Sequence, residues 1–484
     1  MKKKLFTSFI CLIYWSISAQ TSLQSNLDMI IQQSFYKHAH IGISIRDGKT
    51  GKIIASHEKD RLLIPASTIK LLTTFSGVEI LGEPFKFTTK VTYDGDIDAD
   101  GNLKGNIYIE GSGDPSLGSD RIPGVMPMST LINQIIEDVK KAGILCLEGN
   151  IIADESIFNS FPISPSWQWN DLGNYYAAGA WGININENLY NIYYHRSGAI
   201  GSTASIAYYQ PTIPSLQLAN EVTIDSADTE DNAYIFGGPY HYGKRIVGTI
   251  PQGKNLFKIK GSLPDPPLFM AYSIMLAFAK NEMGGHNYRC MYHPDPKAST
   301  RKRIASYDSP PLSTLIKYTN ESSINMYAEA ILKTIAIHKS GKGTGTDGIK
   351  AIKAYLTGLG IDTTPLHMED GSGLSSRNLM SPDVMSEFLY YILKNKDEGL
   401  IKSTLPRVGE TGTVRNILSR SKAKGKMWIK SGSMDKVLTY AGYCQGASGR
   451  LVTFSVFLNG STAKNMKENK AELEKILEAI YRFS

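Results

Sequence analysis

The stretch from Ser67 to Leu81 reads Ser-Thr-Ile-Lys-Leu-Leu-Thr-Thr-Phe-Ser-Gly-Val-Glu-Ile-Leu, and it predicts a helix that ends before Gly82. Residues three apart lie on one face of a helix, so Lys70 is expected one turn from Ser67. A serine hydroxyl becomes a good nucleophile when a base lies within hydrogen-bonding reach. The apolar neighbours of Lys70 would desolvate its ammonium group and favour the neutral amine. The stretch therefore predicts a nucleophile and its base at the start of a buried helix.

The same Ser-x-x-Lys spacing occurs elsewhere, where it is typical of a helix cap beside a solvated lysine. These further matches begin at Ser56, Ser299, Ser419, Ser421, Ser433 and Ser461. They lie in more polar or charged surroundings, whereas Ser67 opens a long and largely apolar segment. Placement, rather than the spacing itself, favours Ser67 as the nucleophile.

The segment Ser323-Ile-Asn325 carries a second pair of polar groups, at the head of an expected helix over 323–337. There the Ser323 hydroxyl could pass a proton, and the Asn325 amide could hold a substrate peptide. A plain helix cap is the alternative interpretation, since Ser and Asn are favoured at that position. The Ser-Arg-Asn sequence at 376–378 has the same spacing and competes with it.

The segment Lys430-Ser431-Gly432-Ser433 follows Met-Trp-Ile and precedes an apolar run, so we expect it on a strand edge. A cation beside a hydroxyl suits the recognition of a carboxylate. Gly432 lets a substrate backbone approach closely, and the Ser433 N–H could join that of the nucleophile as an oxyanion hole. The Lys-Ser-Gly at 339–341 directly follows a helix, where glycine commonly ends the last turn, so we interpret it as a cap.

The remaining periodicity predicts an α+β fold. Helical spacing is found at 23–38, 311–319, 323–337, 347–359, 381–394 and 463–483. Strand patterns are found at 41–45, 53–55, 426–429, 437–442 and 450–458. Together they predict one antiparallel sheet flanked by helices. Residues 84–300 contain short strand-like runs separated by turns, which predict one or two mostly-β inserted modules.

The expected organisation is a signal peptide at 1–19, a main domain in two parts at 20–83 and 301–484, and the insertion at 84–300. The first segment has three lysines, an apolar run and then small residues, which is typical of a secretory signal. An uncleaved anchor is the alternative interpretation. No later stretch is apolar enough to cross a membrane, so we expect no stable span after cleavage.

The composition is that of an ordinary globular protein, with 42% hydrophobic residues, 20% charged residues and a formal charge of +7. No basic stripe is interleaved with aromatic residues, so nucleic-acid binding is not expected. Cys146, Cys290 and Cys444 are widely spaced and indicate neither a zinc site nor a disulfide framework, although one bridge stays open. The histidines show no metal-ligand spacing, and no metal or cofactor is expected.

In this order, the three motifs resemble the D-alanyl-D-alanine carboxypeptidase/endopeptidase family S13 of low-molecular-mass penicillin-binding proteins. Other matching segments are Gly111–Leu117, Trp167–Asp171, Tyr175-Tyr176, Asp370–Ser375, Arg377-Asn378, Ser381-Pro382 and Gly409–Thr413. The resemblance implies a penicillin-binding/serine β-lactamase-like fold with a large insertion. More than half of the chain separates Ser67 from Ser323, whereas class A β-lactamases have no such insertion.

The resemblance also implies roles for the motif residues. Ser67 would be acylated, Lys70 would be the base and Ser323 would pass the proton. Asn325, Lys430, Ser431, Gly432 and Ser433 would bind the substrate. By the same resemblance, a pocket for the amino group of a diaminopimelate side chain would contain Asp171 with Tyr176 beside it, and Arg377 and Asp435 are weaker candidates for the same pocket. A helix cap is the alternative interpretation of Asp171.

The implied function is the hydrolysis of D-Ala-D-Ala bonds in peptidoglycan stem peptides through an acyl-enzyme, with β-lactam antibiotics as inhibitors. The signal segment would direct the protein to the periplasm or cell envelope. Two other functions stay open: a serine β-lactamase, and a catalytically silent wall-binding protein. The intact Ser67 and Lys70 pair argues against the silent protein. The sequence does not decide between carboxypeptidase and endopeptidase preference.

Overall fold

The computed structural model describes residues 23–158, 161–396 and 398–484, and the signal segment expected at 1–19 lies outside them. The chain divides into two compact units. The first unit contains the chain up to residue 80 together with 316–324 and 349–484. The second unit contains 81–315 and 325–348, so the chain passes between the units several times.

The first unit is built on a five-stranded antiparallel sheet. Its strand order is β19 (Met427–Met434), β20 (Val437–Gln445), β21 (Leu451–Asn459), β1 (His40–Asp47) and β2 (Ile53–His57). The two N-terminal strands therefore join the three C-terminal ones through the pairing of β1 with β21, in which His40 lies opposite Asn459. The central strands β20 and β21 are buried at almost every position, because both faces of the sheet are covered.

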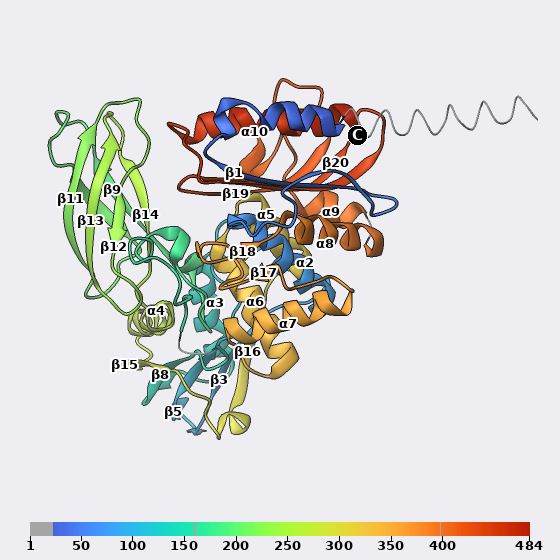
Figure 1. Cartoon of the computed structure of the whole chain (residues 1–484). Coiled ribbons are helices and arrows are strands. Elements are labelled where there is room, and N and C mark those ends of the chain that lie inside the picture. The colour runs from blue at the N-terminus through green and yellow to red at the C-terminus, as the bar shows by residue number, and fades with distance from the viewer. Residues whose placement is uncertain (1–22, 159–160, 397) are drawn as a thin grey trace, which may run out of the picture. The chain divides into compact units, whose positions relative to one another are not determined.

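Helices cover both faces of this sheet. Helix α10 (Met466–Phe483) and the helical residues 23–31 lie on one face, and α8 (Pro382–Asn395) lies on the other (Figure 1). The α10 side chains Leu473, Ile476 and Ile480 are fully buried in one core with the strands. The remaining elements of this unit are α2 (Lys70–Leu81), α9 (Glu398–Thr404), the short hairpin β17 (Leu366–His367) and β18 (Leu379–Met380), and the 3-10 turns η1 (Ser34–Tyr36), η2 (Ala66–Ile69) and η6 (Gly412–Val414).

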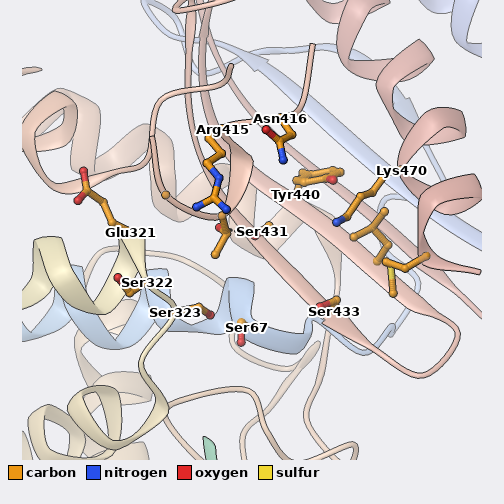
Figure 2. A pocket seen from close by; sticks show the side chains of 14 residues that line it. Ser67, Glu321, Ser322, Ser323, Arg415, Asn416, Ser431, Ser433, Tyr440 and Lys470 are labelled. Atoms are coloured by element: carbon orange, nitrogen blue, oxygen red, sulfur yellow. Dashed lines mark hydrogen bonds between the residues drawn. The ribbon is translucent and has the colours of Figure 1, made fainter. Parts of the chain in front are cut away.

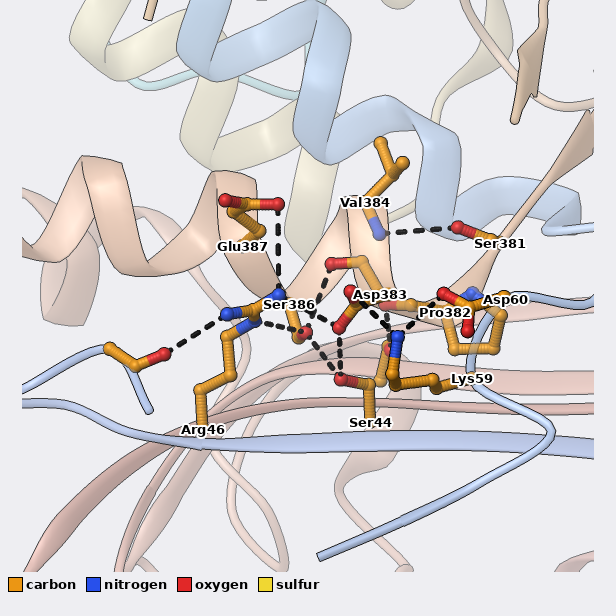
Figure 3. A network of polar contacts seen from close by, with 12 residues as sticks. Ser44, Arg46, Lys59, Asp60, Ser381, Pro382, Asp383, Val384, Ser386 and Glu387 are labelled. Atoms are coloured by element: carbon orange, nitrogen blue, oxygen red, sulfur yellow. Dashed lines mark hydrogen bonds and ion pairs between the residues drawn. The ribbon is translucent and has the colours of Figure 1, made fainter. Parts of the chain in front are cut away.

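A polar network fastens α8 to β1 (Figure 3). The Asp383 carboxylate accepts hydrogen bonds from the Ser44 hydroxyl and the Arg46 guanidinium, both at 2.8 Å. Ser386, one turn further along α8, donates to the Ser44 hydroxyl at 2.8 Å. These groups are largely buried, so each satisfied contact avoids the cost of an unpaired polar group. The network fixes the helix to the sheet on the face opposite α10.

The second unit holds four sheets and a continuous hydrophobic core. The largest sheet has the order β15 (Asn287–Met291), β8 (Asn150–Asp154), β6 (Ile107–Glu110), β3 (Thr88–Tyr93) and β16 (Lys302–Asp308). The others are β10 (Ser205–Gln210), β9 (Leu189–His195) and β14 (Phe257–Ser262); β11 (Gln217–Asp225), β13 (Gly243–Pro251) and β12 (Tyr234–Phe236); and β4 (Asp96–Ile97), β5 (Asn102–Lys104) and β7 (Cys146–Leu147).

Helices also belong to this mainly β unit. These are α3 (Met128–Lys141), α4 (Pro266–Lys280) and α6 (Asn325–Ser340), with the 3-10 turns η3 (Tyr175–Ala177), η4 (Asn186–Asn188) and η5 (Ala298–Thr300). Helix α4 begins where the Asp265 carboxylate accepts a hydrogen bond from the Leu268 N–H at 3.0 Å, and Pro266 occupies its first position. Two more helices, α5 (Leu312–Glu321) and α7 (Gly345–Gly358), each cross a boundary between the units.

The structure also describes the state of the three later cysteines and the hydropathy of the helices. Cys146, Cys290 and Cys444 are all free thiols in the structure. Within the described ranges, no helix is long and apolar enough to cross a membrane.

Candidate active site

Ser67 and Lys70 contact each other directly, as their spacing predicts. The Lys70 amine donates a hydrogen bond to the Ser67 hydroxyl at 2.8 Å. Ser67 lies in the 3-10 turn η2, and α2 begins only at Lys70, one turn later than the sequence pattern predicts. Ala66, just before the serine, adopts the left-handed conformation with φ 44°. Ser67 is half-buried, whereas Lys70 is completely buried.

A buried loop supplies a second partner for Lys70. The Lys70 amine also donates to the backbone carbonyl of Ser372. This loop is held by the Asp370 carboxylate, which accepts from the N–H groups of Gly373 and Ser375, each at 2.7 Å. Gly373 has φ 79°, and a Cβ there would lie 2.0 Å from the Ala66 carbonyl oxygen. The loop can therefore approach the nucleophile turn this closely only because residue 373 is glycine.

A second serine–lysine pair lies in the same unit. The Lys430 amine donates to the Ser323 hydroxyl at 2.9 Å and to the Ser431 carbonyl at 2.6 Å. Burial lowers the pKa of Lys430 well below its usual range, and the charge of Lys70 lowers it further. Two ammonium groups that are both removed from water repel each other, so the arrangement favours one neutral amine. Such an amine is the base that a serine nucleophile needs.

Ser323 does not begin the following helix. Its φ is 57°, a left-handed conformation that a helix cannot include, and α6 starts two residues later at Asn325. The hydroxyl therefore projects from a turn. This turn is what brings Ser323 to the amine of Lys430, 107 residues further along the chain.

Strand β19 passes immediately beside the nucleophile. The turn η2 packs against β19 and β20, and a Cβ at Gly432 would lie 2.7 Å from the Ser67 backbone nitrogen and 2.4 Å from the Thr439 hydroxyl oxygen. No side chain fits there without movement of backbone atoms. The absence of a side chain at 432 therefore sets the distance between the strand and the nucleophile.

A cavity of about 520 Å³ opens next to these residues (Figure 2). Ser67, Ser323, Ser431 and Ser433 line it. The structure thus brings the predicted nucleophile, the second-motif serine and the third-motif strand together around one cavity of the first unit. The size is within the range typical of ligand-binding pockets.

Other lining residues were missed in the sequence. Thr413 lies next to the third motif and shares a hydrogen bond of 2.7 Å with the Ser431 hydroxyl. Arg415, Asn416 and Lys470 line the cavity further from Ser67. Thr413 falls in a segment noted for its resemblance to the family, which could have indicated it. Arg415 and Lys470 are surface-type residues without a distinctive pattern, and only the fold places them here.

Three more predicted residues lie in the second unit, where they form a separate group. The Asn325 amide donates to the Tyr176 backbone carbonyl at 2.8 Å. The Tyr176 hydroxyl donates to the Asp171 carboxylate at 3.1 Å, and burial raises the pKa of Asp171 above its usual value. The side chain of Tyr176 packs edge-on against Tyr175. The structure therefore connects Asn325 with Asp171 through one tyrosine.

The side chain of Arg377 has a different neighbour from those of Ser67 and Asp171. It belongs to the first unit, its side chain is 71% exposed, and its nearest acidic partner is Glu369 at 3.8 Å. Asp435 follows strand β19 in the turn to β20. Among the residues that the structure describes, no cluster of His, Cys, Asp and Glu could hold a metal ion.

The Ser67 and Lys70 pair, the second serine and the strand glycine follow the motif order of the active-site serine enzymes that bind penicillin. A family model described as the D-Ala-D-Ala carboxypeptidase 3 (S13) family matches residues 23–480. The chain therefore belongs to the D-Ala-D-Ala carboxypeptidase 3 (S13) family, and the family and enzyme class expected from the motifs are confirmed.

Curated relatives match over almost the same length. The chain is 25% identical to D-alanyl-D-alanine carboxypeptidase DacB of Haemophilus influenzae over 467 residues, covering 93% of this chain and 92% of the relative. It is 24% identical to D-alanyl-D-alanine carboxypeptidase of Actinomadura sp. strain R39 over 463 residues, covering 91% of this chain and 81% of the relative.

Solved structures confirm the fold. Penicillin-binding protein 4 (dacB) from Haemophilus influenzae superposes with a TM-score of 0.79 at 24% identity, covering 94% of this chain and 98% of that one. The same protein in complex with a novel β-lactam superposes with a TM-score of 0.75 at 22% identity, covering 94% of this chain and 99% of that one. The expected α+β penicillin-binding fold is thus the observed one.

Proposed function

We propose that this protein hydrolyses D-Ala-D-Ala peptides of peptidoglycan through an ester on Ser67, with Lys70 as the base. The observation that carries the proposal is the 2.8 Å hydrogen bond between the Lys70 amine and the Ser67 hydroxyl, at the edge of a cavity. A fully buried amine that touches a half-buried hydroxyl is positioned to take its proton.

The reaction begins when the neutral Lys70 amine removes the Ser67 proton and the Ser67 oxygen attacks the penultimate D-Ala carbonyl carbon. The carbon–nitrogen bond to the terminal D-Ala then breaks as its amine receives a proton. Ser323 is placed to carry that proton, since its hydroxyl contacts the amine of Lys430. Water subsequently attacks the ester and regenerates the Ser67 hydroxyl.

The third-motif strand would hold the substrate. A terminal carboxylate that binds beside Lys430 would favour its ammonium form, and Lys430 with the hydroxyls of Ser431 and Ser433 would then hold the carboxylate by charge-assisted hydrogen bonds. The backbone N–H groups of Ser67 and Ser433 would stabilise the oxyanion. Gly432, which has no side chain between the strand and Ser67, supports this role because it leaves room for a substrate backbone.

In the second unit, Asn325 would orient the peptide and Asp171 with Tyr176 would bind an amino group on the substrate side chain. The hydrogen bond between Tyr176 and Asp171 supports a common role for them. Arg377 is proposed for the same pocket from its place in the sequence motif.

The location and the inhibitors are part of the same proposal. The first nineteen residues have the pattern of a secretory signal, so the protein would act in the periplasm or cell envelope. β-Lactams would acylate Ser67 in place of the peptide. The β-lactam complex of the Haemophilus influenzae relative supports this expectation.

The test is intact-protein mass spectrometry after incubation with benzylpenicillin, together with D-Ala release from an N-acylated peptide that ends in D-Ala-D-Ala. Wild type should gain one persistent adduct and release D-Ala, whereas Ser67→Ala should do neither. Ser76→Ala is the matched control, because the Ser76 hydroxyl is buried in the adjoining helix α2 and has no hydrogen-bond partner among the described residues.

The open alternatives predict other results. Rapid penicillin turnover without a persistent adduct would indicate a β-lactamase. A folded wild type that gives no adduct and releases no D-Ala would indicate a silent wall-binding protein. Either result would overturn the proposed reaction.

A further inference from the structure

The part of the cavity beyond Ser431 is lined by two cationic side chains. Arg415 follows the turn η6, and Lys470 lies in the first turns of α10. Both side chains are exposed and point into the space above Ser431 and Ser433 (Figure 2). Within the described part of the chain, neither forms an ion pair. Two segments far apart in sequence therefore place positive charge at the same end of the cavity.

Neighbouring acids do little to cancel this charge. Glu321 is the acidic residue that lines the cavity, and burial raises its pKa above the usual value. Glu474, one turn along α10 from Lys470, also has a pKa raised by burial, although the charge of Lys470 lowers it. Two cationic side chains and one carboxyl group line the cavity, so the field beyond Ser431 stays positive.

The proposed substrate leaves this charge unused. A terminal D-Ala has one carboxylate and a methyl side chain, and the proposed contacts of Lys430, Ser431 and Ser433 account for the carboxylate. The cavity of about 520 Å³ extends past these residues to Arg415, Asn416 and Lys470. A planar guanidinium and an ammonium that line one cavity are suited to a second carboxylate.

We infer that Arg415 and Lys470 form a leaving-group subsite for a D-amino acid or peptide that carries a carboxylate besides its α-carboxylate. The inference rests on the proposed function, since it concerns the group that leaves when Ser67 is acylated. The bond changes are the same: the Ser67 oxygen–carbon bond forms, the carbon–nitrogen bond breaks, and the departing amine takes the proton. The preferred substrates are therefore branched or cross-linked acidic peptides more than a simple D-Ala terminus.

The test uses three N-acylated peptides that share one acyl part and end in D-Ala-D-Ala, D-Ala-D-Gln or D-Ala-D-Glu. The D-Gln and D-Glu peptides differ only in the side chain of the last residue, which ends in an amide in D-Gln and in a carboxylate of nearly equal size in D-Glu. Wild type should cleave the D-Glu peptide with a kcat/KM about tenfold above that of the D-Gln peptide, as expected for one charge-assisted contact. Product release is followed by liquid chromatography and mass spectrometry.

Variants then assign the preference to the two cations. Arg415→Gln should reduce the D-Glu to D-Gln ratio to about two, and Lys470→Gln should reduce it about threefold. The double variant should bring the ratio to about one. The matched control is Lys467→Gln, because Lys467 is an exposed lysine on the same helix that does not line the cavity. Added salt should also reduce the wild-type ratio, since exposed charges are screened.

The outcomes separate this inference from the proposed function. A wild-type ratio near one, or a ratio that survives in the double variant, would overturn the subsite while hydrolysis of D-Ala-D-Ala still supports the reaction. A fall of the ratio in Lys467→Gln as large as in Lys470→Gln would also overturn it, because general surface charge would then be the cause. Failure to cleave any of the three peptides would overturn the reaction and the subsite together.

Discussion

Among the residues that the structure describes, each unit buries two lysines, but these lysines have different partners. In the first unit, the amines of Lys70 and Lys430 contact serine hydroxyls at 2.8 and 2.9 Å. In the second unit, Lys333 donates to the carbonyls of Phe161 and Ala180, and Lys244 donates to those of Gly237 and Gly238. All four side chains are less than 5% exposed.

Burial by itself therefore does not identify a base. It lowers the pKa of Lys333 and of Lys244 to about 8, although each is held by backbone carbonyls that cannot react. The lysines of the first unit differ because their partners are hydroxyl groups that line a cavity. The partner and its access to substrate separate a catalytic amine from a structural one.

The largest expected effect is the loss of acylation in Lys70→Ala. Without the amine, the Ser67 hydroxyl has no base, so the rate of acylation by penicillin should fall about a thousandfold or more. The measurement is adduct formation over time by mass spectrometry, with circular dichroism to show that the variant is folded. If a folded Lys70→Ala variant were labelled as fast as wild type, the base would lie elsewhere. A contact with a hydroxyl group would then not distinguish a catalytic lysine from a structural one.

The next effect concerns stability and is expected in Lys333→Met. The substitution leaves the Phe161 and Ala180 carbonyls without their donor. At pH 10, where Lys333 is mostly neutral in the folded protein, the free energy of unfolding should therefore fall by about 2 kcal/mol. Denaturant titration measures it. Acylation per folded molecule should stay close to that of wild type. A large loss of acylation in folded protein would mean that this lysine also serves the reaction.

The pH dependence of the same variant sharpens the comparison. Burial lowers the pKa of Lys333 to about 8 in the folded protein, against 10.5 for an ordinary lysine. Between these values the unfolded chain binds the extra proton, so the stability of wild type should rise with pH by about 1.4 kcal/mol per unit from this group. Lys333→Met should lack this contribution. Parallel stability curves for the two proteins from pH 8 to 10 would contradict it.

The smallest effect is expected for an exposed lysine. Lys402 pairs with Glu398 at 2.6 Å, and both side chains are about half exposed. Lys402→Gln should therefore change the free energy of unfolding by about 0.5 kcal/mol or less, and this small change should shrink further in salt. Thermal unfolding at low and high ionic strength tests it. A loss as large as that of Lys333→Met would show that burial is not what distinguishes these lysines.

The sequence predicted the site best where function depends on local spacing. Lys70 is three positions after Ser67, and a helical turn of any kind brings them together. The contact between Ser323 and Lys430 is not local, and the sequence indicated it through the resemblance to a family. The antiparallel sheet was predicted from its alternating strands, and helix α10 from its periodicity.

Other features depend on long-range packing. Nothing near Lys70 indicates that the Ser372 carbonyl, 302 residues away, would be its second partner. Arg415 and Lys470 reach the cavity only because η6 contacts β19 and α10 contacts β20, two neighbouring strands at one edge of the sheet. In the second unit, the buried side chains of α3 recur at helical spacing from Leu131 to Val139, a signal that the mostly-β interpretation of this region overlooked. Helix α4 is apolar on most sides and gives no such signal.

The pairing of β1 with β21 joins strands that lie more than 400 residues apart in the chain. During synthesis β1 emerges early, and it has only β2 as a neighbour until the last strand leaves the ribosome. Contacts this distant in sequence form late and slow the folding of the whole unit. A polypeptide that stops before residue 451 therefore holds its nucleophile turn on an unfinished sheet. We therefore expect a prematurely terminated chain to lack peptidase activity, because only the full-length chain contains the strand that joins β1 to the C-terminal strands.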